Sequence, residues 1–115
     1  FTLTGTRTSS DGGENGLIGL FKADNDALGA TKNVLVEDIA IKDANWIGMF
    51  IFRIDNVTVR RCNLNNGVMY PIKTYCRFSK FEDLNLNDNG IAGDSLYGNG
   101  GFMFIGQDCE VTRVE

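Results

Sequence analysis

The sequence repeats at an interval of 22 to 23 residues, and this repeat limits the possible folds more than any other feature. Three segments, 33–41, 56–64 and 79–86, share one order of apolar and charged residues. Aligning them gives one apolar column of Val36, Val59 and Phe81 and a second of Ile41, Leu64 and Leu86. A further copy begins at Val111. A fixed interval of this length indicates a solenoid, in which each repeat stacks on the next.

Each copy contains two short runs of alternating apolar and polar residues, separated by a charged pair. In the first copy, Val34 and Val36 precede the pair Glu37–Asp38, and Ile41 follows it. Alternation with a period of two predicts a β-strand with one buried face. We expect the chain to bend at the charged pair, so that strand, bend and strand follow one another at a fixed coil length.

A further apolar segment precedes three of these copies and predicts a third strand in each coil. The alignment places Met49, Tyr70 and Met103 in one inward column and Ile51, Ile72 and Ile105 in the next. The neighbouring residues then point outward. One outward column consists of Phe50, Pro71 and Phe104, extended by Phe21, and the next consists of Phe52, Lys73 and Gly106. The predicted outer surface therefore carries an aromatic stripe.

The charged pairs support the same alignment. Acid, base and acid alternate in two columns, which are Glu37, Arg60 and Glu82, then Asp38, Arg61 and Asp83. In this register opposite charges meet on adjacent coils, whereas a shifted register brings like charges together. We interpret these residues as a solvated charge ladder and not as a catalytic cluster.

Residues 56–67, Asn-Val-Thr-Val-Arg-Arg-Cys-Asn-Leu-Asn-Asn-Gly, resemble the repeat of the pectate-lyase-like β-helix superfamily. The resemblance runs from about residue 16 to the end. It implies an all-β fold, a right-handed parallel β-helix of about four to five coils. We expect residues 1–115 to form a single segment of a longer β-helix. The superfamily includes polysaccharide lyases, glycoside hydrolases and phage tailspikes, so the resemblance is specific for the fold and weak for the function.

The composition narrows the partners and the chemistry. A net charge of −4 disfavours nucleic acid, which needs a cationic surface. No apolar run reaches the roughly 18–20 residues of a membrane span. The chain has no His, and Cys62, Cys76 and Cys109 form no Cys-x-x-Cys pair, so neither a zinc site nor a histidine base is expected. We expect reduced cysteines, which favours a virion protein over a secreted enzyme and leads us to predict a virion or extracellular location.

Three stretches lengthen the coil and are predicted loops, near residues 9–16, 24–29 and 90–101. The last presents Asp94 and Tyr97 among glycines, either as a surface excursion or subunit contact, or as a substrate lip. We interpret Asp24-Asn-Asp26 and the asparagines from Asn85 to Asn89 as turns. No cofactor is therefore predicted, and calcium at Asp24-Asn-Asp26 stays open as the alternative.

An exposed aromatic stripe is uncommon without a partner. A polysaccharide lying along the coils would stack its sugar rings on Phe50, Phe52 and Phe104, with Tyr97 added from the long loop. An identical chain in a homotrimer would cover the same stripe. The remaining alternative is that loops fold over the stripe, or that the inward and outward sets are exchanged by a one-residue error.

Cleavage of a glycan would need two carboxyl groups, or a base beside a cation. The candidates are Asp43, Asp88 and Asp94 for hydrolysis, and Lys73 with Arg53 or Arg77 for β-elimination. The sequence thus predicts a β-helix segment that binds a polysaccharide, with cleavage as a lyase or glycoside hydrolase left open. The alternative is a structural module of a trimeric spike or fibre, in which the stripe is the subunit interface.

Overall fold

A computed structural model describes residues 1–5, 16–21, 31–44, 46–67, 70–89 and 102–115. Within these ranges the chain is all-β, as predicted, and contains no helix. The strands are β1 (Thr2–Thr4), β2 (Gly16–Phe21), β3 (Thr31–Glu37), β4 (Ala40–Lys42), β5 (Ile47–Asn65), β6 (Ile72–Arg77), β7 (Lys80–Asn85), β8 (Met103–Gln107) and β9 (Glu110–Val114). They form one continuous, parallel-paired sheet that does not close into a barrel.

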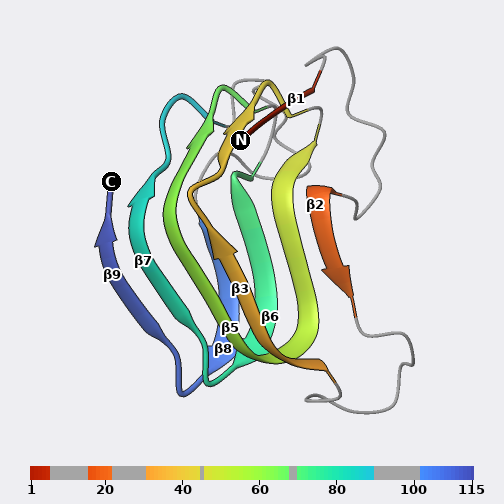
Figure 1. Ribbon diagram of the computed structural model, residues 1–115, viewed down its shortest axis with the longest axis vertical. Coiled ribbons are helices and arrows are strands. Elements are labelled where there is room, and N and C mark those ends of the chain that lie inside the picture. The colour runs from red at the N-terminus through yellow and green to blue at the C-terminus, as the bar shows by residue number, and fades with distance from the viewer. Residues whose placement is uncertain (6–15, 22–30, 45, 68–69, 90–101) are drawn as a thin grey trace.

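The long strand β5 organises this sheet. It turns at its middle, so that its two parts run in opposite directions (Figure 1). The first part pairs with β2 and β6, the second with β3 and β7, and the end with β4. β6 continues to β8, β7 to β9, and β4 to β1. All of these pairings are parallel, which requires that paired strands be joined by long connections and not by tight turns.

The register of the pairs confirms the sequence repeat. Val36 pairs with Val59, and Val59 pairs with Phe81, at separations of 23 and 22 residues. Ile41 pairs with Leu64. Phe81 pairs with Val111, so the extra residues of the last repeat lie between β7 and β9. Equivalent apolar residues of successive repeats therefore lie side by side.

Residues with left-handed backbone mark the bends. Twelve of the described residues other than glycine have positive φ, a conformation that side chains make costly. Eleven of them fall into three columns of the strand register. The first corner consists of Asn33, Asn56, Phe78 and Asp108, the charged corner of Asp38, Arg61, Asp83 and Arg113, and the third corner of Asp43, Asn66 and Asp88. The chain bends at the same positions in each repeat, and one of them is the predicted charged pair.

The core lies on one side of the bent sheet. Buried residues alternate along β5 and continue into the neighbouring repeats. They include Met49, Ile51, Ile54, Val57, Val59, Cys62 and Leu64 on β5, together with Ile72, Phe81 and Leu84. Each large apolar side chain buried in this way stabilises the fold by about 1.5–3 kcal/mol. The stacked core thus explains why the apolar pattern recurs at a fixed interval.

The predicted alignment of the third strand is wrong in two repeats. Met49 pairs with Ile72 and not with Tyr70, and Ile51 pairs with Thr74. Ile72 still faces the core, but its partner on β5 is Met49 and not Ile51, which lies two residues further along the strand. In the last repeat Thr74 pairs with Phe104, which exchanges the predicted inward and outward sets.

Two local features cause this error. The predicted columns treat Val57, Phe78 and Val111 as equivalent positions. Phe78, however, is an exposed corner residue, and the buried position beside Val57 belongs to Ser79, whose hydroxyl accepts a hydrogen bond from the Val57 backbone N–H. In addition, a bulge at Arg53 shifts the register between β5 and β6, and it shortens the repeat from 23 to 22 residues.

Candidate functional site

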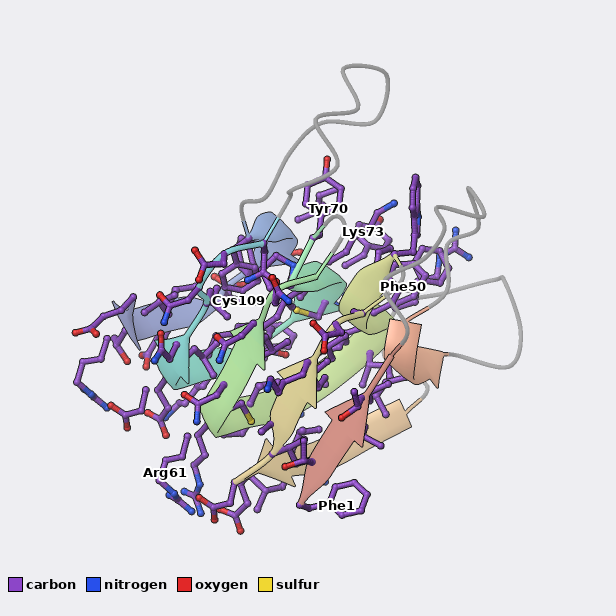
Figure 2. The ribbon with its side chains drawn as sticks, turned by 90° about the horizontal axis from the view of Figure 1, so that it is seen from above. Phe1, Phe50, Arg61, Tyr70, Lys73 and Cys109 are labelled. Carbon is purple, nitrogen blue, oxygen red and sulfur yellow. The ribbon has the colours of Figure 1, made fainter. Side chains whose placement is uncertain are left out.

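The outward side chains of β5, β6 and β8 form a surface that we call the aromatic face, defined by Phe50, Phe52, Lys73, Tyr75 and Ile105. Phe50 pairs with Lys73, while Phe52 pairs with Tyr75, which pairs with Ile105. Figure 2 shows Phe50, Lys73 and Tyr70 on one side of the molecule and Arg61 on the opposite side. The aromatic face and the charged corner are therefore separate surfaces.

The rings of the aromatic face are in contact with one another. The ring centroids of Phe50 and Phe52 lie 5.7 Å apart, and those of Phe52 and Tyr75 also lie 5.7 Å apart. Phe50 is buried in a small cluster with Trp46, outside the main core. Because strand residues alternate between the two sides of a sheet, Phe50 is directed away from its buried neighbours Met49 and Ile51. The face thus has a packed aromatic base with Phe52 and Tyr75 half-buried above it.

A groove of about 430 Å³ follows this surface. Its lining residues are Phe50, Phe52, Arg53, Lys73, Thr74, Tyr75 and Ile105. Two cations lie over its rings: the Lys73 ammonium is 5.5 Å from the Phe50 centroid, and the Arg53 guanidinium is 4.9 Å from the Phe52 centroid. Such cation–π contacts hold a charge beside an apolar surface. The groove therefore offers both ring-stacking area and positive charge.

The bulge at Arg53 belongs to this site. Arg53 has φ of 60° and is the one described residue other than glycine with positive φ that lies outside the three corners. Register shifts of this kind re-aim a side chain. Here the guanidinium of Arg53 lies over Phe52, at the edge of the groove.

The predicted catalytic residues do not gather into one site. Asp43 and Asp88 lie in the third corner, two repeats apart, which corresponds to a backbone separation of about 10 Å. Asn66 lies between them and donates a hydrogen bond from Nδ2 to Asp43 Oδ1 at 2.5 Å. Lys73 lies at the middle of the aromatic face instead. Asp94 is outside the described residues.

Asparagine side chains make the third corner a hydrogen-bonded ladder. Asn89 Oδ1 accepts from the Gly67 backbone N–H at 3.0 Å, and Asn89 Nδ2 donates to the Leu64 carbonyl at 2.8 Å. Asn65 Oδ1 accepts from the Asn87 backbone N–H at 3.3 Å. This arrangement agrees with the interpretation of these asparagines as turns. The other segment considered for calcium, Asp24-Asn-Asp26, lies outside the described residues.

Arg77, a candidate cation for β-elimination, is held by a carboxylate. Its Nε and one terminal nitrogen donate to the two oxygens of Asp55 at 2.9 and 2.8 Å. Asp55 is buried, and its hydrogen bond raises the pKa of Arg77. The charge of Arg77 is therefore paired within the protein.

At the charged corner, ion pairs join the first and second members of the predicted columns. Arg60 Nε and Arg61 each donate to Glu37 Oε2 at 2.7 Å, and Arg61 Nε donates to Asp38 at 2.7 Å. Arg113 extends the series by pairing with Asp83. The hydrogen bond from Arg61 lowers the pKa of Asp38, and that from Arg113 lowers the pKa of Asp83. These contacts support the structural interpretation of the corner.

The structure changes the membership of the aromatic stripe. Phe104 pairs with Thr74, so its predicted column with Phe50 is wrong. Its ring centroid lies 5.8 Å from that of Phe81 and 5.6 Å from that of Phe102. Tyr75 and Ile105 take its place, and Phe21 pairs with Phe52 and not with Phe50. The period-two alternation of 72–77 could have identified Tyr75 once Ile72 was set inward. Tyr97 lies outside the described residues.

Comparisons with known proteins add no assignment. No protein-family model matches the chain, and neither a curated protein nor a solved structure does. Across the described ranges there is no helix of the length and apolar character needed to cross a membrane. Among the same residues, no group of three or more His, Cys, Asp or Glu side chains is placed to hold a metal ion.

Proposed function

We propose that the chain is a segment of a right-handed parallel β-helix of the pectate-lyase-like type, and that its aromatic face binds a polysaccharide. The observation that carries the binding proposal is the groove of about 430 Å³, where Phe50, Phe52 and Tyr75 lie beside Lys73 and Arg53. A virion or extracellular location, where such glycans occur, belongs to the same proposal.

The stacking of the bends supports the β-helical part. Corners recur in three columns, and every pairing among the described strands is parallel. A chain that bends three times per repeat and returns to pair with itself in parallel describes a helical coil of strands. Parallel crossover connections are right-handed in nearly all proteins, which favours that hand here.

The chemistry of the groove suits a sugar chain. A pyranose has an apolar patch of C–H groups that stacks on an aromatic ring, while its hydroxyl groups need polar partners. The half-buried rings of Phe52 and Tyr75 have centroids 5.7 Å apart, a spacing comparable with that of successive sugars in an extended glycan, and the buried ring of Phe50 supports Phe52. Lys73 and Arg53 supply donors for hydroxyl or carboxylate oxygens.

Binding is tested by titration with a panel of capsular polysaccharides and pectins. Trp46, the single tryptophan, is buried against Phe50 and gives a fluorescence signal close to the groove. We expect Phe52→Ala and Tyr75→Ala each to weaken binding about tenfold or more, as for aromatic anchors in other interfaces. Phe78→Ala is the matched control, because Phe78 is an exposed aromatic residue of the first corner. Equal losses in all three variants, or none, would refute the assignment.

Cleavage is a separate part of the proposal, as a lyase or as a glycoside hydrolase. New reducing ends without an unsaturated product would indicate hydrolysis, and an unsaturated product would indicate β-elimination. Turnover that survives replacement of Asp43, Asp88, Asp94 and Lys73 by Ala would remove these residues as catalysts.

The alternative is a structural module in which the aromatic face packs against other copies in a homotrimer. The observation in its favour is Ile105, an aliphatic side chain of this face that is 49% exposed and offers no ring to a sugar. Sedimentation equilibrium decides between the two proposals. A trimer that dissociates in the Ile105→Lys variant supports the interface, and a monomeric wild-type chain rejects it.

A further inference from the structure

Two of the three cysteines lie within contact of each other in successive repeats. Cys76 Sγ and Cys109 Sγ are 4.0 Å apart, although the residues are 33 positions apart in the sequence. Cys76 belongs to β6 and is buried, while Cys109 lies in the bend between β8 and β9 and is half-buried. Both are free thiols in the structure.

A glycine makes this approach possible. Gly106 pairs with Cys76 across β6 and β8. A Cβ atom at Gly106 would lie 3.1 Å from Cys109 Sγ and 2.5 Å from the Phe104 ring, so no larger residue fits there unless its neighbours move. Cys109 Sγ therefore occupies the space beside Gly106 that a side chain would fill, which brings it close to Cys76.

We propose that Cys76 and Cys109 form a reversible disulfide in the presence of a small-molecule disulfide such as oxidised glutathione, covalently joining two successive repeats. This proposal is independent of glycan binding. The sulfur atoms must approach by about 2 Å to reach bonding distance. Because Cys109 is the more exposed of the two, we expect its side chain to make most of that movement.

The exchange proceeds in two balanced steps. The Cys109 thiolate attacks one sulfur of oxidised glutathione, forming a mixed disulfide and releasing one glutathione thiolate. The Cys76 thiolate then attacks Cys109 Sγ, forming the internal disulfide and releasing the second glutathione. Two protein thiols are oxidised, one glutathione disulfide is reduced to two thiols, and the two protons pass to the released glutathione molecules.

The surroundings of the two thiols set the order of these steps. Burial is the main cause that raises the pKa of Cys76 to about 11, so this residue is protonated near neutral pH and reacts slowly with a reagent from solvent. Cys109 is more accessible and is therefore the first to react with oxidised glutathione. Once Cys109 carries glutathione, Cys76 is already adjacent to it, which favours closure over further exchange.

The bond would close a ring that includes residues 77–108. A cross-link of this kind restricts the unfolded chain and stabilises the folded one. Because it ties β6 to the bend after β8, the effect falls on the last repeat. We expect the oxidised chain to melt at least about 5 °C higher than the reduced chain.

The test is incubation of the full chain with oxidised glutathione, followed by thiol titration under denaturing conditions and peptide mapping. We expect the number of reactive thiols to fall from three to one, with a peptide that links Cys76 to Cys109. Cys62→Ser is the control and should still form the link, because Cys62 lies on β5, where its thiol donates to the Arg60 carbonyl. Cys109→Ser should form no internal link.

Three outcomes would overturn the proposal: glutathione that remains on Cys109 without closure, three thiols that stay reactive, or a link that involves Cys62. The peptide map of the wild-type chain decides the question even if a serine variant fails to fold.

Discussion

The charged corner and the aromatic face are built from the same repeat, but they use it differently. Along the charged corner, each repeat contributes a residue with left-handed backbone, and acidic and basic side chains alternate. Along the aromatic face, Phe50 is followed by Lys73, and the bulge at Arg53 interrupts the register. A charge ladder stabilises the stacking of repeats only if the pattern recurs, because each charged side chain pairs with an opposite charge on the next repeat. The aromatic face, which we propose as a binding surface, combines aromatic and cationic side chains where the repeat is interrupted.

The largest effect should come from the stacked core on which both surfaces rest. Phe81 is fully buried, and its ring packs against that of Phe102 with the centroids 5.2 Å apart. Phe81→Ala should lower the free energy of unfolding by about 3–5 kcal/mol, measured by denaturant titration. Phe78→Ala, at an exposed ring three residues away, should change it by no more than about 0.5 kcal/mol. Similar costs for the two variants would contradict the register.

A smaller effect of opposite sign is expected at the first corner. Phe78 has φ of 52°, in a column where two other repeats have Asn33 and Asn56. Asparagine tolerates left-handed backbone better than phenylalanine does. Phe78→Asn should therefore raise the free energy of unfolding by about 0.5–1 kcal/mol. A loss of stability would mean that the exposed ring makes contacts that outweigh the backbone strain.

The smallest effect is expected at the charged corner, because its ion pairs are exposed. Arg61→Ala should lower the melting temperature by no more than about 4 °C, and less at high salt. The pKa of Asp38 is lowered by Arg61, so the stabilisation is present above the pKa of the unfolded carboxyl and is lost as the pH falls through the folded one. Arg61→Ala should weaken this acid dependence. Unchanged acid dependence in the variant would contradict the pairing.

Some strands could be predicted from the sequence pattern more accurately than others, and the difference has physical causes. The strands around Val36, Val59 and Phe81 were predictable, because burial on one face imposes a strict alternation and stacking imposes the interval. The segments with Ile72 and Phe104 were predicted less well. The side-chain pattern does not report a bulge, and an apolar residue such as Phe78 can occupy an exposed bend.

The candidate site was predicted only in part, because the sequence pattern does not fix the phase of every repeat. Phe50 and Phe52 lie on the predicted outward surface, because β5 keeps its phase from the aligned segment. Lys73 lies there because its neighbour Ile72 on β6 faces the core, as predicted. Tyr75 was missed, and Phe104 was included wrongly, since both depend on the phase of neighbouring repeats. The carboxylates were chosen by residue type at turns, and residue type at a turn does not determine which side chains meet.

We propose that the aromatic face binds a polysaccharide and that the charged corner does not. Nuclear magnetic resonance tests this directly: a polysaccharide is titrated into the isotopically labelled chain, and binding is monitored through backbone chemical-shift changes. We expect changes concentrated at Phe52, Arg53, Lys73 and Tyr75, with little change at Arg61. Changes centred on Arg61 and the charged corner, with none on β6, would contradict it.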